Sequence, residues 1–372
     1  MASPAALGER EVTIVDLAMF DAINSIERRY QPYLQQLPTA KPTSADAAAA
    51  SAAATALTGL HPEAAASFKA ALAEYLAKLD AAPEALGNGV RLGEAAALKI
   101  LEARANDGAT AADSYRPRTQ PGQYVPTAVM VCPTWPTMRP FALASPSQFR
   151  PGPPLSLKSR EWAVDYNEIK EFGSKTSARR SAKQTETARF WLMTGPQAYH
   201  PLARQMVAER HLNLIDSARF MALFAVALTD AYIAVFDAKY HYEFWRPGTA
   251  IRNADLDNNP ATERDATWQP LDNTPMHPEY PCAHCIESGA AQVALESLGQ
   301  PLPELSLTSA TAPGVTHSWS NLDDFTTEVA NARIWAGFHY RFSTRVGTAL
   351  GRQVGEYVAN TIMQPVDRTA QR

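Results

Sequence analysis

Hydrophobic positions recur with helical spacing along most of this chain. Near the N-terminus they fall every three to four residues, at Val12, Val15, Met19, Ala22, Ile23 and Ile26. This spacing places them on one face of an amphipathic helix. Similar patterns, or alanine-rich composition, predict further helices at about 45–58, 61–80, 92–106, 159–172, 178–193, 212–238, 284–298, 323–338 and 344–362. Strand-like alternation is hardly seen, so the sequence predicts an all-α helical bundle with additional N-terminal helices.

One stretch interrupts this pattern. Residues 115–154 are dense in proline, which removes backbone donors and blocks helix propagation. The same stretch holds Trp135, Phe141 and Phe149, and a flexible linker would be poorer in aromatic residues. We therefore expect an ordered covering segment at 115–158, between an N-terminal helical part at 1–114 and a C-terminal bundle at 159–372. The three parts are predicted to form one integrated domain.

Composition narrows the classes of partner. The chain has 372 residues, 46% of them hydrophobic, and a formal net charge of −4. Nucleic acids and anionic membrane surfaces require basic patches, so neither is expected as a partner. The longest apolar run, 220–228, is too short for a bilayer core that needs ~20 residues, which predicts a soluble protein that does not span a membrane. The first ten residues lack a secretory pattern, so localisation stays open. A periplasmic or secreted protein is expected if a signal peptide has been removed, and a cytoplasmic one if not.

Three cysteines are too few for a disulfide framework. Cys282, His284 and Cys285 lie close in sequence, and His277 precedes them, but no second Cys or His pair stands at the spacing of a structural zinc site. A local disulfide between Cys282 and Cys285 stays open.

The candidate chemistry lies in three short motifs. In KYHYEFWRP, Lys239 and Arg246 are seven residues apart, so a continuous helix would project both cations from one face, ~10.5 Å apart along its axis. Pro247 disfavours helical geometry at Arg246 and predicts that the helix ends there. Taken alone, the pair is more often two solvated charges on a helix face than an anion site.

The second motif is PEYPCAHC. Pro281 suits an early position of the helix that follows, which would leave the first amides, at Cys282, Ala283 and His284, without intrahelical partners. Such amides form an anion site that the helix dipole strengthens. An imidazole beside that site, at His284, is suited to proton transfer near neutral pH.

The third motif is ARIWAGFHYRFS. Arg333 and His339 are six residues apart and would diverge by ~120° on an ideal helix. They converge if the helix bends, and Gly337 is the expected place for a bend. An amphipathic helix end with a surface arginine and a packed histidine would give the same local pattern.

Together, the three motifs resemble a known pattern. K-x6-R-P, then P-C-A-H, then A-R-x5-H follow in the order K-x6-R-P, P-S-G-H, S-R-x5-H-x3-D of the superfamily shared by vanadium-dependent haloperoxidases and type 2 phosphatidic-acid and acid phosphatases. Patches such as AMFDAINSIERRYQPYL and PFALASPSQFRPGPP also look like soluble bacterial haloperoxidase-like proteins.

The resemblance implies a role for each motif position. Vanadate or phosphate oxygens would be held by Lys239, Arg246, the side chain of Cys282, the amide of Ala283 and Arg333. His284 would be the acid and base. His339 would bind vanadium directly, or attack phosphorus to form a phosphohistidine.

Three positions depart from the pattern. Cys282 replaces a serine, and a thiol beside peroxide is exposed to oxidation unless a disulfide protects it. Ala283 replaces glycine but keeps the amide. Ser343 replaces an aspartate, so another group must orient His339. Ser343 itself is one candidate for this role, and the remaining candidates are Asp230, Asp237 and Glu287.

The preferred interpretation is a vanadium-dependent haloperoxidase-like enzyme, because HYRFS resembles the corresponding string of soluble haloperoxidases. Its expected cofactor is vanadate, and its expected substrates are hydrogen peroxide and halide. An acid phosphatase that hydrolyses a phosphomonoester without a cofactor is the alternative, and an inactive or repurposed oxyanion binder is the third interpretation. A homo-oligomer is compatible with the sequence. The candidate wall residues of the pocket are Phe236, Tyr242, Trp245 and Trp135.

Overall fold

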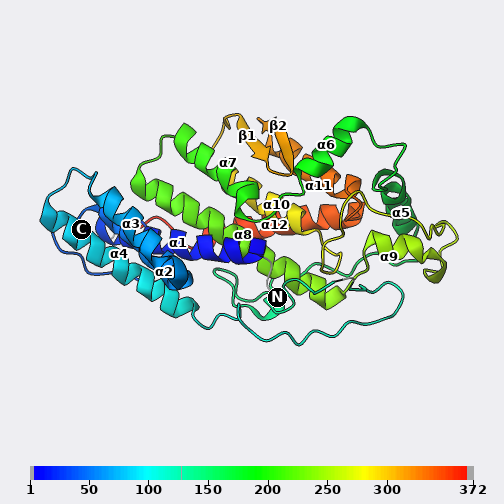
Figure 1. The fold of residues 1–372 in the computed structure, drawn as a ribbon, viewed down its shortest axis with the longest axis horizontal. Helices are drawn as coiled ribbons and strands as arrows, with labels where there is room; N and C mark the ends of the chain where they lie inside the picture. Colours follow the sequence, from blue (N-terminus) through cyan, green and yellow to red (C-terminus); the bar gives the residue numbers. More distant parts are fainter. Residues whose placement is uncertain (1–3, 127, 367–372) are drawn as a thin grey trace.

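The computed structural model describes residues 4–126 and 128–366 (Figure 1). Helices dominate these residues, which confirms the all-α prediction. In chain order the α-helices are α1 (Pro4–Glu27), α2 (Ala45–Leu60), α3 (Ala65–Leu76), α4 (Pro83–Arg104), α5 (Arg160–Phe172), α6 (Ala182–Phe190), α7 (Pro196–Glu209), α8 (Leu214–Tyr242), α9 (Pro247–Arg252), α10 (Ala283–Glu296), α11 (Leu322–Trp335) and α12 (Arg341–Thr361). Three short 3-10 turns lie at Pro62–Ala64, Trp135–Thr137 and Ala254–Leu256. Two strands, β1 (Leu305–Ser309) and β2 (Ala312–Trp319), form an antiparallel hairpin.

The central element is α8, which crosses the middle of the molecule in Figure 1. Helices α1, α10 and α12 all pack against it. By length and composition α8 is apolar enough to cross a membrane, but 94% of its most apolar window is buried inside the fold. Its hydrophobic surface is therefore covered by other helices, as expected for the core helix of a bundle.

Helices α10 and α12 approach each other closely because glycines line their crossing. A Cβ atom on Gly351 would lie 2.0 Å from the carbonyl oxygen of Ile286, and one on Gly289 would lie 2.3 Å from that of Thr348. Gly347 similarly faces the carbonyl oxygen of Cys282, at 2.6 Å from its ideal Cβ position. These contacts fix the distance of the α10 N-terminus from α12.

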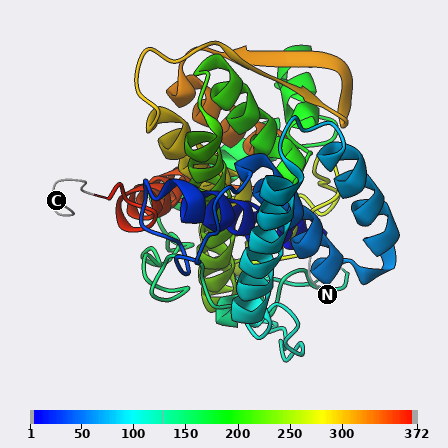
Figure 2. The ribbon, with the colours of Figure 1, turned by 90° about the vertical axis from the view of Figure 1, so that its left-hand side faces the viewer.

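The alanine-rich helices form a separate layer over α1. Helix α2 packs against both α1 and α4, and α3 lies outside them without a buried residue (Figure 2). The side chain of Ser44 caps α2 by accepting a hydrogen bond from the amide of Ala47. These helices are therefore outer members of the assembly.

The proline-rich segment is ordered against α8. The buried carboxylate of Asp230 accepts hydrogen bonds from the amides of Phe141, Ala142 and Leu143, at 2.7 to 2.9 Å. Further along, Arg150 forms a bidentate ion pair with Asp237, with both contacts at 2.7 Å. Two carboxylates of α8 therefore hold a segment that has almost no regular structure of its own.

The sequence patterns missed α7 and the hairpin. Helix α7 begins at Pro196, where a missing amide costs nothing because first-turn amides have no intrahelical partner. It also contains Pro201, beyond the first turn, and an internal proline argues against a helix in the sequence. The hairpin alternates buried and exposed residues at Leu305–Ser309, but its serine and threonine content hides the strand pattern. Helix α4 also begins at Pro83, earlier than the predicted residue 92.

Candidate active site

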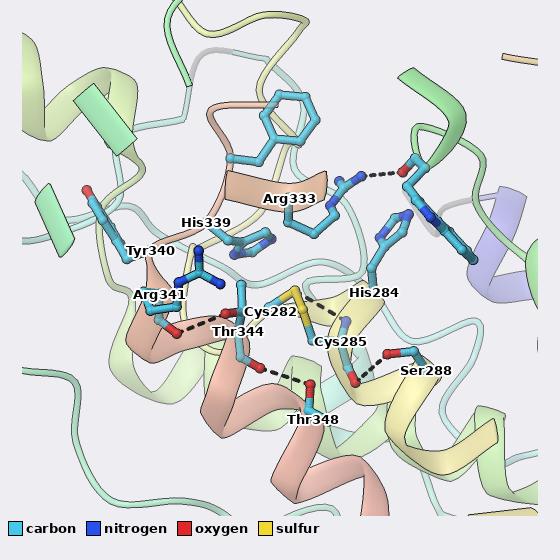
Figure 3. The surroundings of a disulfide bond; sticks show 12 residues. Cys282, His284, Cys285, Ser288, Arg333, His339, Tyr340, Arg341, Thr344 and Thr348 are labelled. Carbon is cyan, nitrogen blue, oxygen red and sulfur yellow. Dashed lines mark hydrogen bonds between the residues drawn. A yellow bond between two sulfur atoms is a disulfide. The ribbon is translucent and has the colours of Figure 1, made fainter. Parts of the chain in front are cut away.

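Three chain segments, each at the end or the beginning of a helix, meet beside the N-terminus of α10. They are the residues that follow α8, the turn before α10 and the connection from α11 to α12. Figure 3 shows His339, Arg333 and His284 close to the Cys282–Cys285 disulfide at the start of α10. The structure thus brings together the residues that the three motifs predict.

Lys239 and Arg246 reach the site from different elements. Helix α8 ends at Tyr242, where Glu243 adopts a left-handed conformation at φ 49°, and Arg246 lies in extended backbone just before α9. The expectation that both cations share one helical face is therefore wrong. The physical reason is that Pro247 begins a new helix, for which its fixed φ is suited, and the intervening residues turn the chain.

Both cations are buried and held by carbonyl oxygens. The Nζ of Lys239 donates to the carbonyl oxygens of Pro278 and Glu279 at 2.9 and 2.8 Å. Arg246 donates through Nε to the carbonyl oxygen of His277 at 2.9 Å and through one terminal nitrogen to that of Phe338 at 3.0 Å. These bonds fix the two positive groups before any ligand is bound.

Arg333 lies in the last turn of α11 and donates to the carbonyl oxygen of Trp191. Its Nε is buried and has no hydrogen-bond partner among the described residues. The helix ends at Trp335, Gly337 adopts φ +81°, and His339 lies in the connection before α12. This confirms the bend predicted at Gly337, which brings His339 and Arg333 to the same site.

At the second motif, Cys282 is the N-cap of α10 and forms a disulfide with Cys285. Pro281 thus precedes the cap and is not an early helical residue as expected. The Sγ of Cys282 accepts a hydrogen bond from the amide of Cys285 at 3.2 Å. The disulfide removes the thiol hydrogen, so the side chain of Cys282 has no proton to donate to an oxyanion, which corrects its predicted role.

The amides of Ala283 and His284 occupy the first two helical positions, where α-helical N–H groups have no intrahelical partner. The Nε2 of His284 is 2.9 Å from the carbonyl oxygen of Met193. Since a carbonyl can only accept, Nε2 carries the proton and Nδ1 carries the lone pair in the neutral ring. His284 therefore presents Nδ1 as its base.

His339 is oriented by a residue that the sequence patterns missed. Its Nδ1 lies 2.8 Å from Oε1 of Glu279, a fully buried carboxyl group in the turn before α10. The same oxygen accepts the amide of Tyr340 at 3.1 Å. The only sequence signal was the position of Glu279 inside PEYPCAH, next to the anion-binding turn.

None of the four residues expected to orient His339 does so. Asp230 and Asp237 bind the covering segment, as described above. Glu287 is buried close to Tyr232, and Ser343 lies near Glu279, where its hydroxyl lowers the pKa of that carboxyl group. Burial is the larger effect and raises the pKa of Glu279 to about 7.

Positively charged side chains predominate in the site. Burial lowers the pKa of Lys239 well below its ordinary value and lowers those of Arg246 and Arg333 to about 10. The pKa values of His284 and His339 are also lowered, first by burial and then by the neighbouring cations. Within the described chain, these three cations hydrogen-bond to carbonyl oxygens and imidazole nitrogens and not to carboxylates.

Buried charges require compensation. The three cations outnumber the two buried carboxyl groups close to them, Glu279 and Glu287. Free first-turn amides lie beside the cations, as does the Arg333 Nε, which has no partner among the described residues. These donors suit a tetrahedral oxyanion such as vanadate or phosphate, and His339 offers an imidazole nitrogen that can bind its central atom.

A cavity of about 300 Å³ opens over this cluster. Its polar wall includes His277, His284 and Arg333, and its apolar wall includes Phe236 and Phe338. His277, which is 3.0 Å from a terminal nitrogen of Arg246, is a further residue that the motif analysis did not place in the site.

Of the four expected wall residues, only Phe236 lines this cavity. Trp135 and Trp245 are packed in the hydrophobic core. The hydroxyl of Tyr242 donates to the carbonyl oxygen of Pro151 in the covering segment. Large aromatic side chains in this region thus serve mainly to pack the covering segment and the helices together.

Comparison with known proteins agrees with this geometry. Residues 219–368 match the family model described as the VCPO second helical-bundle domain. A vanadium chloroperoxidase from Curvularia inaequalis is 31% identical over 140 residues, which cover 31% of this chain. The match spans 22% of the length of that chloroperoxidase.

Solved structures share the whole fold. A bacterial vanadium-dependent iodoperoxidase superposes with a TM-score of 0.83 at 24% identity, over 98% of this chain and 93% of the other. The apo and holo forms of a bacterial vanadium-dependent chloroperoxidase give TM-scores of 0.77 and 0.78 at 18% identity, over 95% of this chain and 92% and 91% of theirs. The chain therefore shares the fold of these bacterial vanadium-dependent peroxidases, and its residues 219–368 match the VCPO second helical-bundle domain.

Proposed function

We propose that this protein is a vanadium-dependent haloperoxidase that oxidises halide with hydrogen peroxide. The observation that carries the proposal is the set of three buried cations, Lys239, Arg246 and Arg333, arranged around His339 without a direct carboxylate partner among residues 4–126 and 128–366. Such a site is stabilised when a multiply charged oxyanion enters, because the anion compensates charges that burial disfavours. The relatives described above, all vanadium-dependent peroxidases, support vanadate as that anion.

Each residue has a defined task in this proposal. The three cations and the amide of Ala283 hold the oxygens of the anion. His339 offers Nε2 to its central atom, and Nδ1 of His284 takes a proton from hydrogen peroxide and later returns it. Vanadate held there would supply a Lewis-acidic centre that polarises peroxide towards attack by halide.

The disulfide removes an objection to the peroxidase reaction. A free Cys282 thiol next to a peroxide-binding site would be oxidised towards sulfenic and sulfinic acid. In the structure both sulfurs of the pair are already oxidised to a disulfide and are fully buried. The replacement of serine by cysteine is thus compatible with sustained turnover.

The test compares two reactions of one preparation. The metal-free protein is loaded with orthovanadate and assayed for halide-dependent peroxide consumption, and the vanadate-free protein is assayed for hydrolysis of an aryl phosphate. We expect oxidation of at least one halide, no hydrolysis above background, and loss of the oxidation in His339→Ala. Arg116→Ala, at a site on the covering segment exposed to solvent, is the matched control that retains the oxidation.

Hydrolysis of the aryl phosphate without halide oxidation would replace the proposal with a phosphatase. Vanadate binding without either activity would replace it with an oxyanion binder. The substrate halide is read from the same assay by comparing iodide, bromide and chloride.

A further inference from the structure

The hydrogen bond between Glu279 and His339 helps to decide which ring nitrogen of His339 can bind another atom. Imidazole has two nitrogens, and in the neutral ring one carries the proton while the other carries the lone pair. The identity of the lone-pair nitrogen decides which atom can bind the centre of an oxyanion.

Two independent contacts select the same tautomer. A terminal nitrogen of Arg246 lies 3.2 Å from Nε2 of His339, and a guanidinium group can only donate, so Nε2 must accept. On the other side of the ring, Nδ1 faces Oε1 of Glu279 at 2.8 Å. Oε1 also accepts a hydrogen bond from the backbone amide of Tyr340 at 3.1 Å, so this oxygen acts as an acceptor.

The backbone of Glu279 is hydrogen-bonded on both sides of the residue. The backbone amide of Glu279 donates to the carbonyl oxygen of Phe244 at 2.9 Å, and its own carbonyl oxygen accepts Nζ of Lys239 at 2.8 Å. Its side chain is fully buried. Lys239, one of the three cations of the candidate site, therefore also holds the backbone of Glu279. The orientation of His339 and the position of the Lys239 ammonium group both depend on the turn before α10.

The motif pattern that this chain resembles has an aspartate four residues after the third-motif histidine, where this chain has Ser343. Here the carboxyl group comes instead from a residue 60 positions earlier in the sequence. We propose that Glu279 is the positioning residue of the site, which holds His339 with its proton on Nδ1 and leaves Nε2 to bind the oxyanion centre. The part of this inference that concerns vanadate rests on the proposed function.

The expected effect follows from how such partners act on metal-binding histidines. A hydrogen-bonded acceptor fixes the tautomer and the ring orientation and raises the basicity of the other nitrogen, and loss of such a partner typically costs 10- to 100-fold in affinity. Glu279→Leu removes the acceptor at similar volume. Glu279→Gln keeps an oxygen that can accept from Nδ1 and from Tyr340.

The experiment reads the tautomer directly. Nitrogen-15 NMR of the vanadate-free protein, labelled at histidine and assigned with His339→Gln, reports which ring nitrogen of His339 is protonated. We expect Nδ1–H with a hydrogen-bonded proton in the wild type and in Glu279→Gln. In Glu279→Leu the Arg246 contact still favours Nδ1–H, so we expect the Nδ1 proton to lose its hydrogen-bond shift while remaining on that nitrogen. Glu287→Leu removes another buried carboxyl group close to Arg333 and is the matched control, expected to keep the hydrogen-bonded Nδ1–H.

Orthovanadate binding, followed by vanadium-51 NMR, is the second measurement. We expect Glu279→Leu to bind at least tenfold more weakly than the wild type. A wild-type His339 protonated on Nε2 would overturn the inference, and so would a Glu279→Leu protein with an unchanged Nδ1 proton resonance and unchanged affinity. If Glu279→Leu does not fold, the wild type and Glu279→Gln decide, since Nε2–H in either contradicts the assignment. A wild type that binds no vanadate defeats the proposed function alone, because the tautomer is measured without vanadate.

Discussion

The close approach of α12 to the anion-binding turn predicts a large effect for a small substitution, Gly347→Ala. The added Cβ would lie 2.6 Å from the carbonyl oxygen of Cys282 and 3.1 Å from Cβ of Cys285, whereas ordinary contacts begin at 3.4 Å. The first contact is with backbone, which cannot rotate away. The start of α10 must therefore move by about 0.8 Å relative to α12.

The magnitude combines two opposing effects on stability. Alanine is favoured over glycine inside a helix by about 0.5–1 kcal/mol. Overpacking of a close-packed interior costs about 1–3 kcal/mol, so we expect a net loss of about 1–2 kcal/mol in the free energy of unfolding. Functional groups need placement within about 0.5 Å, so a shift of the Ala283 amide and His284 should weaken orthovanadate or phosphate binding by at least about tenfold.

The assay is denaturant unfolding together with an anion titration, and Gly87→Ala is the matched control. Gly87 is also inside a helix, but the nearest atom to its added Cβ is the mobile end of Arg91, at 3.5 Å. This variant should gain about 0.5–1 kcal/mol and bind anions as the wild type does. If Gly347→Ala were as stable as Gly87→Ala and bound anions equally well, the argument from close helix packing would be refuted.

Three further predictions concern the site and its support. Lys239→Met should abolish the stabilisation by orthovanadate, which reaches about 2.7 kcal/mol in the wild type at a ligand concentration 100 times Kd, as measured by unfolding with and without the anion. Burial raises the pKa of Asp230 from 3.8 to about 6, so the folded state favours the protonated carboxyl group. The stability that this protonation contributes is present at low pH and is lost as pH rises through 6. The stability of Asp230→Asn relative to the wild type should therefore rise between pH 4 and 7 by up to about 3 kcal/mol, and a pH-independent difference would contradict the buried charge. Cys285→Ala frees the Cys282 thiol, so hydrogen peroxide should add oxygen atoms to Cys282 in mass spectra and inactivate the enzyme. The double variant Cys282→Ser with Cys285→Ala should resist peroxide, and equal resistance of both variants would exclude a protective role of the disulfide.

Helix periodicity located most of the bundle, because burial against α8 imposes a regular spacing of apolar residues. It failed where local composition conflicts with the final structure. Helix α7 carries one proline at its start and a second, Pro201, in its interior. Strand β1 alternates buried and exposed residues but has too many small polar side chains to be recognised. In both cases packing against neighbouring elements decides the conformation.

The motifs identified residues that the fold brings together at the candidate site, because their order and spacing are distinctive. They did not give the correct path of the chain between Lys239 and Arg246, where a left-handed residue ends α8. They also missed Glu279 as the partner of His339. That contact joins residues 60 positions apart, and no periodic pattern records such a distance.

The sequence by itself determined the helical class, the ordered covering segment and the residue types that can hold an oxyanion, because these depend on local spacing and on side-chain chemistry. Only the tertiary structure decided how these residues are used. It joined Cys282 to Cys285, which leaves the anion to amides and cations, and it assigned the buried carboxylates Asp230 and Asp237 to the covering segment. Pairing of buried polar groups depends on which segments meet in space, so it is settled when the helices pack.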